Sequence, residues 1–284
     1  MLLKEHFDEE NIVYWMAFQI LMGNVDTQNR NVYLYSPLNS DIWYFIAWDN
    51  DGCLMRSEYE LKNFSDQGSW EKGISNYWGN VLFQRCLKSR SFREKLNDAI
   101  LELREYLNKD MLISKIESYK NVLKPYLYSM PDAEYEPLTS EQYDQIVASL
   151  PDEIEKNYKL YLESLETPMP FYIGVPTIDG NKLKFNWDVS YDLDAEDITY
   201  SVEVARDYLF HDVIYHNTTL TVPETEMDLP EAGQYFVRIR ATNTSGKTQD
   251  AFDYYVTDEG KHYGMKCFYI IEDSTVEEDN YEEG

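Results

Sequence analysis

Acidic and amide side chains flank one aromatic-rich stretch of the chain, within residues 23–52. The first group consists of Asn24, Asp26, Asn29 and Asn31, and the second of Asp49, Asn50 and Asp51. Their oxygens are hard ligands, which proteins use to hold a divalent cation against a phosphate. The pattern between the groups predicts strands over 31–36 and 42–48, joined by a turn at 36–39. Paired as a hairpin, these strands bring both groups to the same end.

A simpler explanation for the same residues is local structure. Asn and Asp are common turn formers, because their short side chains hydrogen-bond to nearby backbone. Asp26, Asn31 and Asp49 could therefore do no more than cap two strands. The two explanations differ in one respect, because a chemical site requires the residues to converge.

Composition restricts the possible partners. The chain has 284 residues, of which 25 are basic and 52 acidic, with a formal net charge of -27. Phosphate contact needs clustered Lys and Arg, so we expect no binding to nucleic acid. No apolar run of about 18 residues occurs, so no membrane span is expected, and no signal peptide is visible at the N-terminus. The three cysteines have no metal-binding spacing and are expected to be free thiols.

The first part of the chain has helical periodicity. Residues 8–22 predict a helix that Gly23 can end, and further amphipathic stretches predict helices from about residue 78 to residue 123. A capping box at Thr139 and Gln142 predicts the start of another helix. Pro151 fits the first turn of a separate helix that follows it.

The periodicity changes after Pro168 and Pro170, since two prolines within three residues cannot continue a helix. Short alternating strands separated by turn residues then predict an all-β sandwich. We expect four segments: an α-rich domain with a short β-hairpin at 1–130, a helical linker at 131–167, a sandwich at 168–271 and a solvated acidic tail at 272–284. The fold class is therefore α+β and multidomain.

The stretch GNVDTQNRNVYLY, followed by a strand that ends in IAWDND, resembles the catalytic centre of the spore coat protein H (CotH) kinase family. The resemblance extends through WGNVLFQRCL at 78–87 and FREKL at 92–96, and covers roughly residues 8–165. It implies an atypical protein-kinase-like fold that uses ATP and Mg²⁺ or Mn²⁺. The implied reaction is phosphoryl transfer from ATP to Ser or Thr of a protein.

The resemblance also assigns roles to individual residues. Asp26 matches the catalytic-loop aspartate that orients the acceptor hydroxyl, and Asn24 would hydrogen-bond to this loop. Asn31 follows Asp26 by five residues, the interval at which ordinary kinases place a metal-binding Asn. Asp49 matches the metal-binding aspartate, and Asp51 could assist with a second ion.

Only 25 residues precede Asp26, and they contain no Gly-rich loop. We therefore expect the chain to hold the C-terminal lobe of the kinase-like domain without the lobe that grips the nucleotide. The alternative function is a non-catalytic bacterial surface or binding protein, with the kinase-like part as a scaffold and the sandwich as a docking module. Either function implies a protein substrate or cell-surface partner, and association suggests a bacterial cell surface or secreted location.

Residues 170–257 resemble a fibronectin type III domain. Trp187 lies in LKFNWD, where that family places its core Trp, and Leu229 precedes Tyr235 by the spacing of its tyrosine corner. The resemblance implies a sandwich fold and assigns no function.

Overall fold

The computed structural model describes residues 3–28, 30–55, 68–136, 138–272 and 275–278. Asn29 of the first polar group lies outside these ranges. The chain divides into two compact units, one formed by Met1–Ser65 with Lys72–Leu162 and the other by Asp66–Glu71 with Glu163–Gly284. The residues expected to form a linker, up to 162, thus belong to the first unit. No helix in the described ranges is long and apolar enough to cross a membrane.

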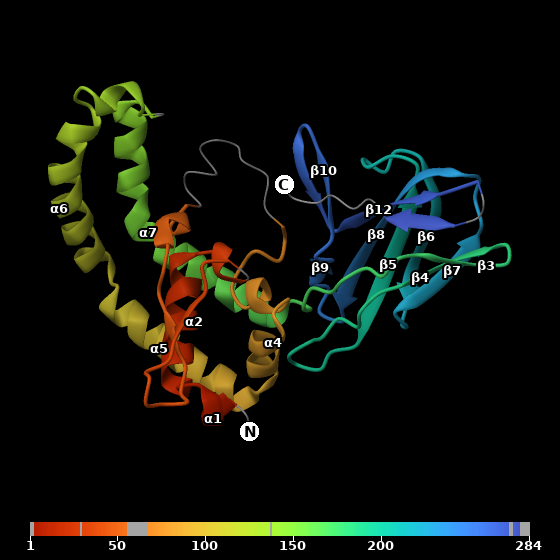
Figure 1. Cartoon of the computed structure of the whole chain (residues 1–284), viewed down its shortest axis with the longest axis horizontal. Coiled ribbons are helices and arrows are strands. Elements are labelled where there is room, and N and C mark those ends of the chain that lie inside the picture. Colours follow the sequence, from red (N-terminus) through yellow and green to blue (C-terminus); the bar gives the residue numbers. More distant parts are fainter. Residues whose placement is uncertain (1–2, 29, 56–67, 137, 273–274, 279–284) are drawn as a thin grey trace. The chain divides into compact units, whose positions relative to one another are not determined.

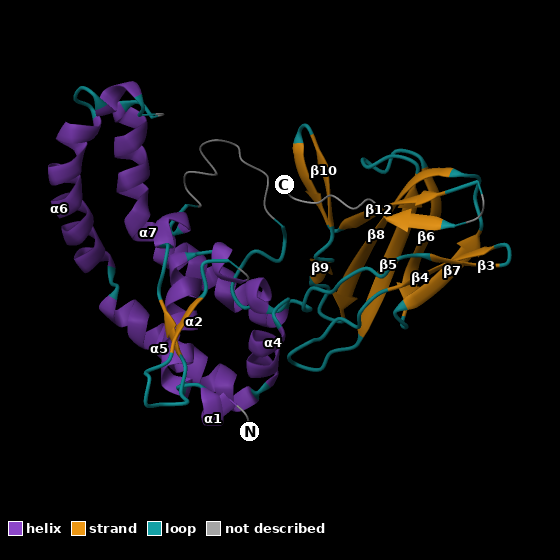
Figure 2. Ribbon diagram, viewed as in Figure 1, coloured by secondary structure: helices purple, strands orange, loops and turns teal. Residues whose placement is uncertain are grey.

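The first unit is mainly helical (Figures 1 and 2). Its helices are α1 (Leu3–His6), α2 (Glu9–Met22), α4 (Val81–Lys88), α5 (Arg90–Tyr106), α6 (Lys109–Leu127) and α7 (Ser140–Glu166), the last of which ends in the second unit. Single 3-10 turns occur at Asp26–Gln28, Asn50–Gly52, Ser75–Tyr77 and Asp132–Glu134. Its strands are β1 (Tyr33–Tyr35) and β2 (Tyr44–Ile46).

Helix α2 forms the centre of the first unit because it is apolar around most of its circumference. It begins after Asp8, whose carboxylate accepts a hydrogen bond from the Asn11 backbone N–H at 2.8 Å. Its Trp15 stacks on Phe83 of α4 at 5.6 Å between ring centroids and packs against Phe45 of β2 at 4.9 Å. The predicted helix over 8–22 and the predicted hairpin are both confirmed, although the strands are shorter than expected.

The sequence predicts two helices between residues 139 and 165, and this is wrong. Helix α7 is continuous through Pro151. An internal proline costs about 3 kcal/mol because it removes a hydrogen bond and crowds the preceding turn. Burial of Val147, Ile154 and Tyr161 on the two sides of the proline offsets this cost. The predicted capping box does start the helix, with reciprocal Thr139–Gln142 bonds of 2.9 and 3.2 Å.

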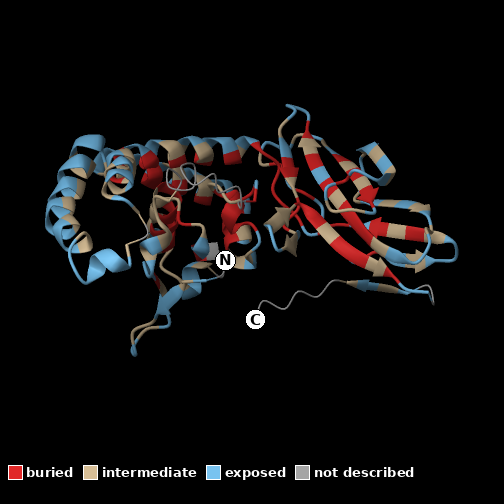
Figure 3. Cartoon of the chain, turned by 90° about the horizontal axis from the view of Figure 1, so that it is seen from above, coloured by how far each residue is buried: buried red, intermediate tan, exposed pale blue. Residues whose placement is uncertain are grey.

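The second unit is a β-sandwich. Strands β3 (Thr177–Asp179), β4 (Lys182–Asn186) and β7 (Glu224–Asp228) form one sheet in the order β3-β4-β7. Strands β5 (Ile198–Ala205), β6 (Val213–Leu220), β8 (Gly233–Asn243), β12 (Met265–Ile270) and β13 (Val276–Glu278) form the other in the order β13-β12-β8-β5-β6, with β9 (Thr248–Asp250) beside β8. A separate hairpin joins β10 (Tyr254–Thr257) to β11 (Gly260–Tyr263). Figure 3 shows buried residues, in red, along the sandwich strands.

Two details of the sandwich differ from expectation. Residues 262–271, the last part of the segment expected to be sandwich, are not one strand, because Gly264, with φ +78°, separates β11 from β12. The acidic segment after residue 271 was expected to be a solvated tail, yet Val276–Glu278 pairs with β12. Lys266 of β12 explains the second difference, since its ammonium lies 2.6 Å from the Glu278 carboxylate.

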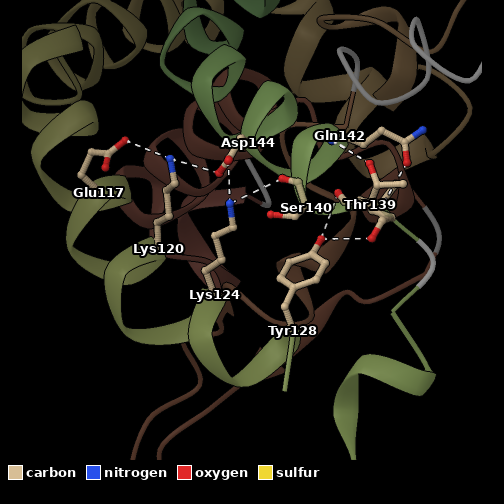
Figure 4. Close-up of polar contacts among 9 residues, drawn as sticks. Glu117, Lys120, Lys124, Tyr128, Thr139, Ser140, Gln142 and Asp144 are labelled. Atoms are coloured by element: carbon tan, nitrogen blue, oxygen red, sulfur yellow. Dashed lines mark hydrogen bonds and ion pairs between the residues drawn. The ribbon is translucent and has the colours of Figure 1, made fainter. Parts of the chain in front are cut away.

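Helices α6 and α7 are connected at one end by charged side chains (Figure 4). Asp144 of α7 lies 2.6 Å from the Lys124 ammonium and 3.3 Å from that of Lys120, both on α6. No residue of α6 is buried, so these ion pairs and the Tyr128 hydroxyl bonds to the carbonyls of Leu138 and Thr139 hold much of this contact. The hydrogen bond with Lys124 is the main cause that lowers the pKa of Asp144.

The Asp144 ion pairs predict a pH-dependent contact between α6 and α7. Because the folded-state pKa of Asp144 is lowered, its contribution is fully present above its ordinary pKa of 3.8 and is lost as the pH falls further. Asp144→Asn should therefore speed amide exchange in α6 at pH 5 to 7 and have no effect near pH 2. Asp132→Asn, at an exposed aspartate between the same helices, is the control. Equal exchange in wild type and Asp144→Asn at pH 7 would contradict the prediction.

Candidate active site

The loop that carries Asp26 begins where α2 ends. Gly23 takes the left-handed conformation, with φ +65°, and the Asn24 backbone N–H donates to the Gln19 carbonyl at 3.1 Å. A second constraint comes from α7, whose Asn157 donates to the Leu21 carbonyl at 2.9 Å. A Cβ on Gly23 would lie 2.6 Å from the Asn157 side-chain nitrogen. Both the backbone conformation and the close approach therefore require glycine at position 23.

Asn24 joins the two polar groups identified from the sequence. Its side chain is only 2 % exposed. The side-chain nitrogen donates to the Asn50 side-chain oxygen at 3.3 Å, while its own oxygen accepts from the Asp26 backbone N–H at 3.3 Å. Asn24 thus hydrogen-bonds to the Asp26 loop, while its part in catalysis stays a prediction. One buried side chain thus holds segments that lie 26 residues apart in sequence.

Gly52 lies directly beside Asp26. A Cβ built on Gly52 would come within 3.3 Å of an Asp26 carboxylate oxygen and 3.7 Å of the Asn24 side-chain oxygen. Glycine therefore leaves the Asp26 carboxylate uncrowded on this side. The carboxylate is itself exposed and accessible to solvent. The structure thus brings together Asn24, Asp26, Asn50 and Gly52.

Asn31 and Asp49 lie at the same end of the β1–β2 hairpin. The pair nearest this end is Tyr33 opposite Ile46, and Asn31 and Asp49 lie just outside it. Both adopt left-handed backbone conformations, with φ of 53° and 50°, which Asn and Asp tolerate better than most residues. Asp49 precedes the turn Asn50–Gly52 without capping it through its side chain.

The metal-binding roles of Asn31, Asp49 and Asp51 stay predictions. Asp49 and Asp51 are exposed, and Asn31 is partly buried. Within the ranges that the structure describes, no three His, Cys, Asp or Glu side chains are grouped so that they could hold a metal ion.

Sequence reasoning missed the segment that carries Asn76 and Tyr77, which holds the Asp26 loop through hydrogen bonds. Asn76 donates from its side chain to the Val25 carbonyl at 3.2 Å, and the Tyr77 hydroxyl lies 2.9 Å from that of Thr27. Thr27 in turn donates to the Asn24 carbonyl at 3.2 Å. Because the single Thr27 hydroxyl proton is used there, Tyr77 is the donor in their shared bond. A separation of 50 residues leaves no periodic signal from which this pairing could have been found.

The carboxylates of the site also act on Cys53. Burial is the main cause that raises the pKa of this thiol to about 12, and the negative charges of Asp51 and Asp26 add to it, while a hydrogen bond with Asn24 opposes the increase. The side chains of both polar groups are thus close enough to act electrostatically on a single thiol. Burial also raises the pKa of Tyr77.

The Tyr77 hydroxyl predicts a measurable stability effect. Tyr77→Phe removes a buried hydrogen bond at constant packing, so it should lower the free energy of unfolding by about 1 kcal/mol. Tyr106→Phe is the matched control, because Tyr106 is 72 % exposed, and it should have no effect. Urea unfolding measures both variants. Equal stability of Tyr77→Phe and wild type would show that the bond to Thr27 contributes nothing.

The Cys53 thiol predicts slow alkylation of the folded protein. A rise in pKa from 9.0 to about 12 leaves roughly a thousandfold less thiolate at pH 8. Iodoacetamide should therefore modify Cys53 slowly in the native protein. In roughly 6–8 M urea, above the unfolding midpoint, it should modify Cys53 rapidly. Peptide mass spectrometry follows both reactions. Rapid labelling of Cys53 under native conditions would contradict the described surroundings of the thiol.

Solved structures resemble the chain only weakly. One described as "Myokine structure" has 19% identity and a TM-score of 0.24, covering 29% of this chain and 87% of its own. The twitchin kinase region from C. elegans has 16% identity and a TM-score of 0.25, covering 34% of this chain and 20% of its own. Domains 1–6 of the surface layer protein SbsC have 14% identity and a TM-score of 0.18, covering 96% of this chain and 38% of their own. These scores are too low to support a structural argument.

No curated protein sequence matches the chain at a significant level. A family model described as CotH kinase protein matches residues 2–161. This range is more than half of the 284 residues and contains every candidate site residue. The CotH resemblance proposed from the sequence is thereby confirmed at the level of the family: the chain belongs to the CotH kinase protein family.

Proposed function

We propose that this chain carries the acceptor- and metal-binding part of a protein kinase site, which transfers phosphate from ATP to Ser or Thr of a protein. The observation that carries the proposal is the pair of Asn24 hydrogen bonds, which fixes the Asp26 loop beside Asn50–Gly52. Family membership supports a kinase-like protein. Catalysis, the nucleotide and the acceptor are the parts that we propose.

Asp26 is the residue proposed to act on the acceptor. Its carboxylate is exposed, so a hydroxyl of a protein substrate can approach it. It would orient that hydroxyl and accept its proton during transfer. The Asn24 bond to the Asp26 backbone fixes the loop before substrate arrives, so no reorganisation is needed at that step.

Asn31, Asp49 and Asp51 are proposed to hold Mg²⁺ or Mn²⁺. Their carboxylate and amide oxygens suit these hard cations, and the missing side chain at Gly52 leaves the adjoining Asp26 carboxylate uncrowded. When bound, the ion would neutralise charge on the phosphate groups. The left-handed conformations of Asn31 and Asp49 are consistent with a demand for particular side-chain directions at these two positions.

The sandwich is proposed to be fibronectin type III-like. The Tyr235 hydroxyl donates to the Glu231 carbonyl at 2.8 Å, as in a tyrosine corner. Trp187 is buried in the core, where it packs against Tyr200 at 5.3 Å between ring centroids. The strand order β6-β5-β8-β12 opposite β3-β4-β7 has the Greek-key arrangement of such domains.

A non-catalytic binding protein is the second candidate. It is favoured by the independent core of the sandwich unit, which suits a docking module. A bacterial cell-surface or secreted location is proposed with either function, on the association of a CotH-type domain with a sandwich of this kind.

Site-directed variants test the kinase proposal. Transfer of labelled phosphate from ATP to casein would be measured with Mg²⁺, with Mn²⁺ and with chelator, on the chain preceded by the nucleotide-binding lobe that this sequence is expected to lack. Asp26→Asn should lower the rate by about 10²- to 10⁴-fold, since it removes the proton acceptor, and Asp49→Asn should abolish metal-dependent activity. Asp41→Asn, at an exposed aspartate of the same hairpin, is the matched control and should leave the rate unchanged.

The result that contradicts the assignment is activity that is equal in wild type, Asp26→Asn and Asp49→Asn. Absence of transfer by the wild-type chain under every metal condition would instead favour the non-catalytic candidate. Circular dichroism of each variant separates loss of activity from loss of fold.

A further inference from the structure

The sandwich unit contains a cavity that the kinase proposal does not use. Its volume is about 240 Å³, and it lies where the β10–β11 hairpin leaves the sandwich, next to β12 and β13. Four aromatic and three charged side chains contribute to its lining: Tyr172, Phe252, Tyr254 and Tyr255, with Asp253, Lys266 and Glu278. This volume is below that of pockets for drug-sized ligands, roughly 300–1,000 Å³, so it suits a single ring-sized group.

The charged side chains of the cavity form two ion pairs that share Lys266. The Lys266 ammonium lies 3.2 Å from the Asp253 carboxylate and 2.6 Å from that of Glu278. The other Asp253 oxygen accepts from the Ile173 backbone N–H at 2.7 Å. Asp253 and Lys266 are only 11% and 18% exposed, whereas Glu278 is 31% exposed. These pairs use two of the three N–H donors of the ammonium, so one donor and further carboxylate lone pairs remain for other hydrogen bonds.

The backbone around these charges is also fixed. The Phe252 N–H donates to the Phe171 carbonyl at 2.8 Å, and the Gly264 N–H donates to the Asp253 carbonyl at 2.7 Å. The first bond holds the residue before Asp253 against the segment that carries Tyr172, and the second closes the base of the β10–β11 hairpin. The cavity is therefore a preformed feature of the unit and does not depend on the conformation of a single side chain.

The aromatic side of the cavity offers an accessible ring. Tyr172 is 50 % exposed, although it is packed against Phe252 at 4.8 Å between ring centroids. Phe252 is itself supported by Trp70 at 5.1 Å. An aromatic face carries partial negative charge, so it attracts C–H groups that carry partial positive charge. The half-exposed ring of Tyr172, packed on Phe252, is therefore suited to stacking against the C–H face of a ligand.

The combination of these groups restricts the ligand class. An anion would meet two carboxylates in a chain of net charge -27. A cation would meet the Lys266 ammonium, which lies between those carboxylates. A neutral polyol both donates to carboxylates and accepts from an ammonium, and the C–H face of its ring can lie on tyrosine.

We propose that this cavity binds one neutral sugar unit, with its ring on Tyr172 and its hydroxyls on Asp253, Lys266 and Glu278. Burial raises the pKa of Asp253 despite the nearby ammonium, which is consistent with a carboxylate that gains from additional hydrogen-bond donors. The sandwich would then attach the chain to a saccharide. No part of this proposal depends on Asp26 or on phosphate transfer.

Saturation-transfer difference NMR titrations test the proposal on the full chain. The neutral probes are methyl β-D-glucopyranoside, N-acetyl-D-glucosamine, cellotetraose and chitotetraose; D-glucosamine and D-glucuronate are the charged comparators. At least one neutral probe should saturate. Tyr172→Ala should weaken its binding about three- to tenfold, which corresponds to the loss of one aromatic contact, and Glu278→Gln should also weaken it.

The controls separate the cavity from general surface effects. Tyr191→Ala replaces another exposed tyrosine of the same unit, outside the cavity lining, and should bind like wild type. Asp26→Asn should also bind like wild type, so failure of the kinase proposal leaves this test intact. The proposal is overturned if no neutral probe saturates, if Tyr172→Ala and Glu278→Gln bind like wild type, or if a charged comparator binds more tightly than its neutral counterpart. Thermal unfolding of each variant verifies that it is folded.

Discussion

The candidate active site depends on the way in which α2 ends. This helix is buried in the centre of the first unit, and the left-handed residue Gly23 stops it where Asn157 of α7 approaches. A helix that continued for one more residue would carry Asn24 away from Asn50 and Asp26 away from Gly52. The apolar packing of α2 therefore determines where the polar chemistry can lie.

Buried amides and hydroxyls, rather than buried charges, hold the site together. Asn24, Thr27, Asn76 and Tyr77 are all nearly inaccessible, and together they connect the Asp26 loop to two distant segments. Neutral groups can be buried with hydrogen bonds at a modest cost, whereas buried charges need partners. This arrangement leaves the carboxylates of Asp26, Asp49 and Asp51 at the surface, where an acceptor or a cation can reach them.

Local patterns made much of this fold predictable. The Gly23 cap, the hairpin and the Thr139–Gln142 box each depend on a few neighbouring residues, so the sequence alone was sufficient. The contacts of Asn76 and Tyr77 join residues about 50 positions apart, and nothing local specifies them. The prediction that a separate helix starts at Pro151 was wrong for a related reason, because the packing that keeps α7 continuous comes from other elements. The position of Asp26 beside Gly52 became visible only in three dimensions.

Paramagnetic NMR with Mn²⁺ tests most directly whether the two polar groups form one cation site. In a ¹⁵N-labelled chain, substoichiometric Mn²⁺ should broaden the amide signals of residues 24–31 and 49–52 first, and Asp49→Asn should abolish this broadening. Broadening centred on the acidic groove between α2 and α5, which Glu9, Glu10, Asp98 and Glu102 line, would contradict this account. Uniform broadening over the acidic surface would contradict it equally.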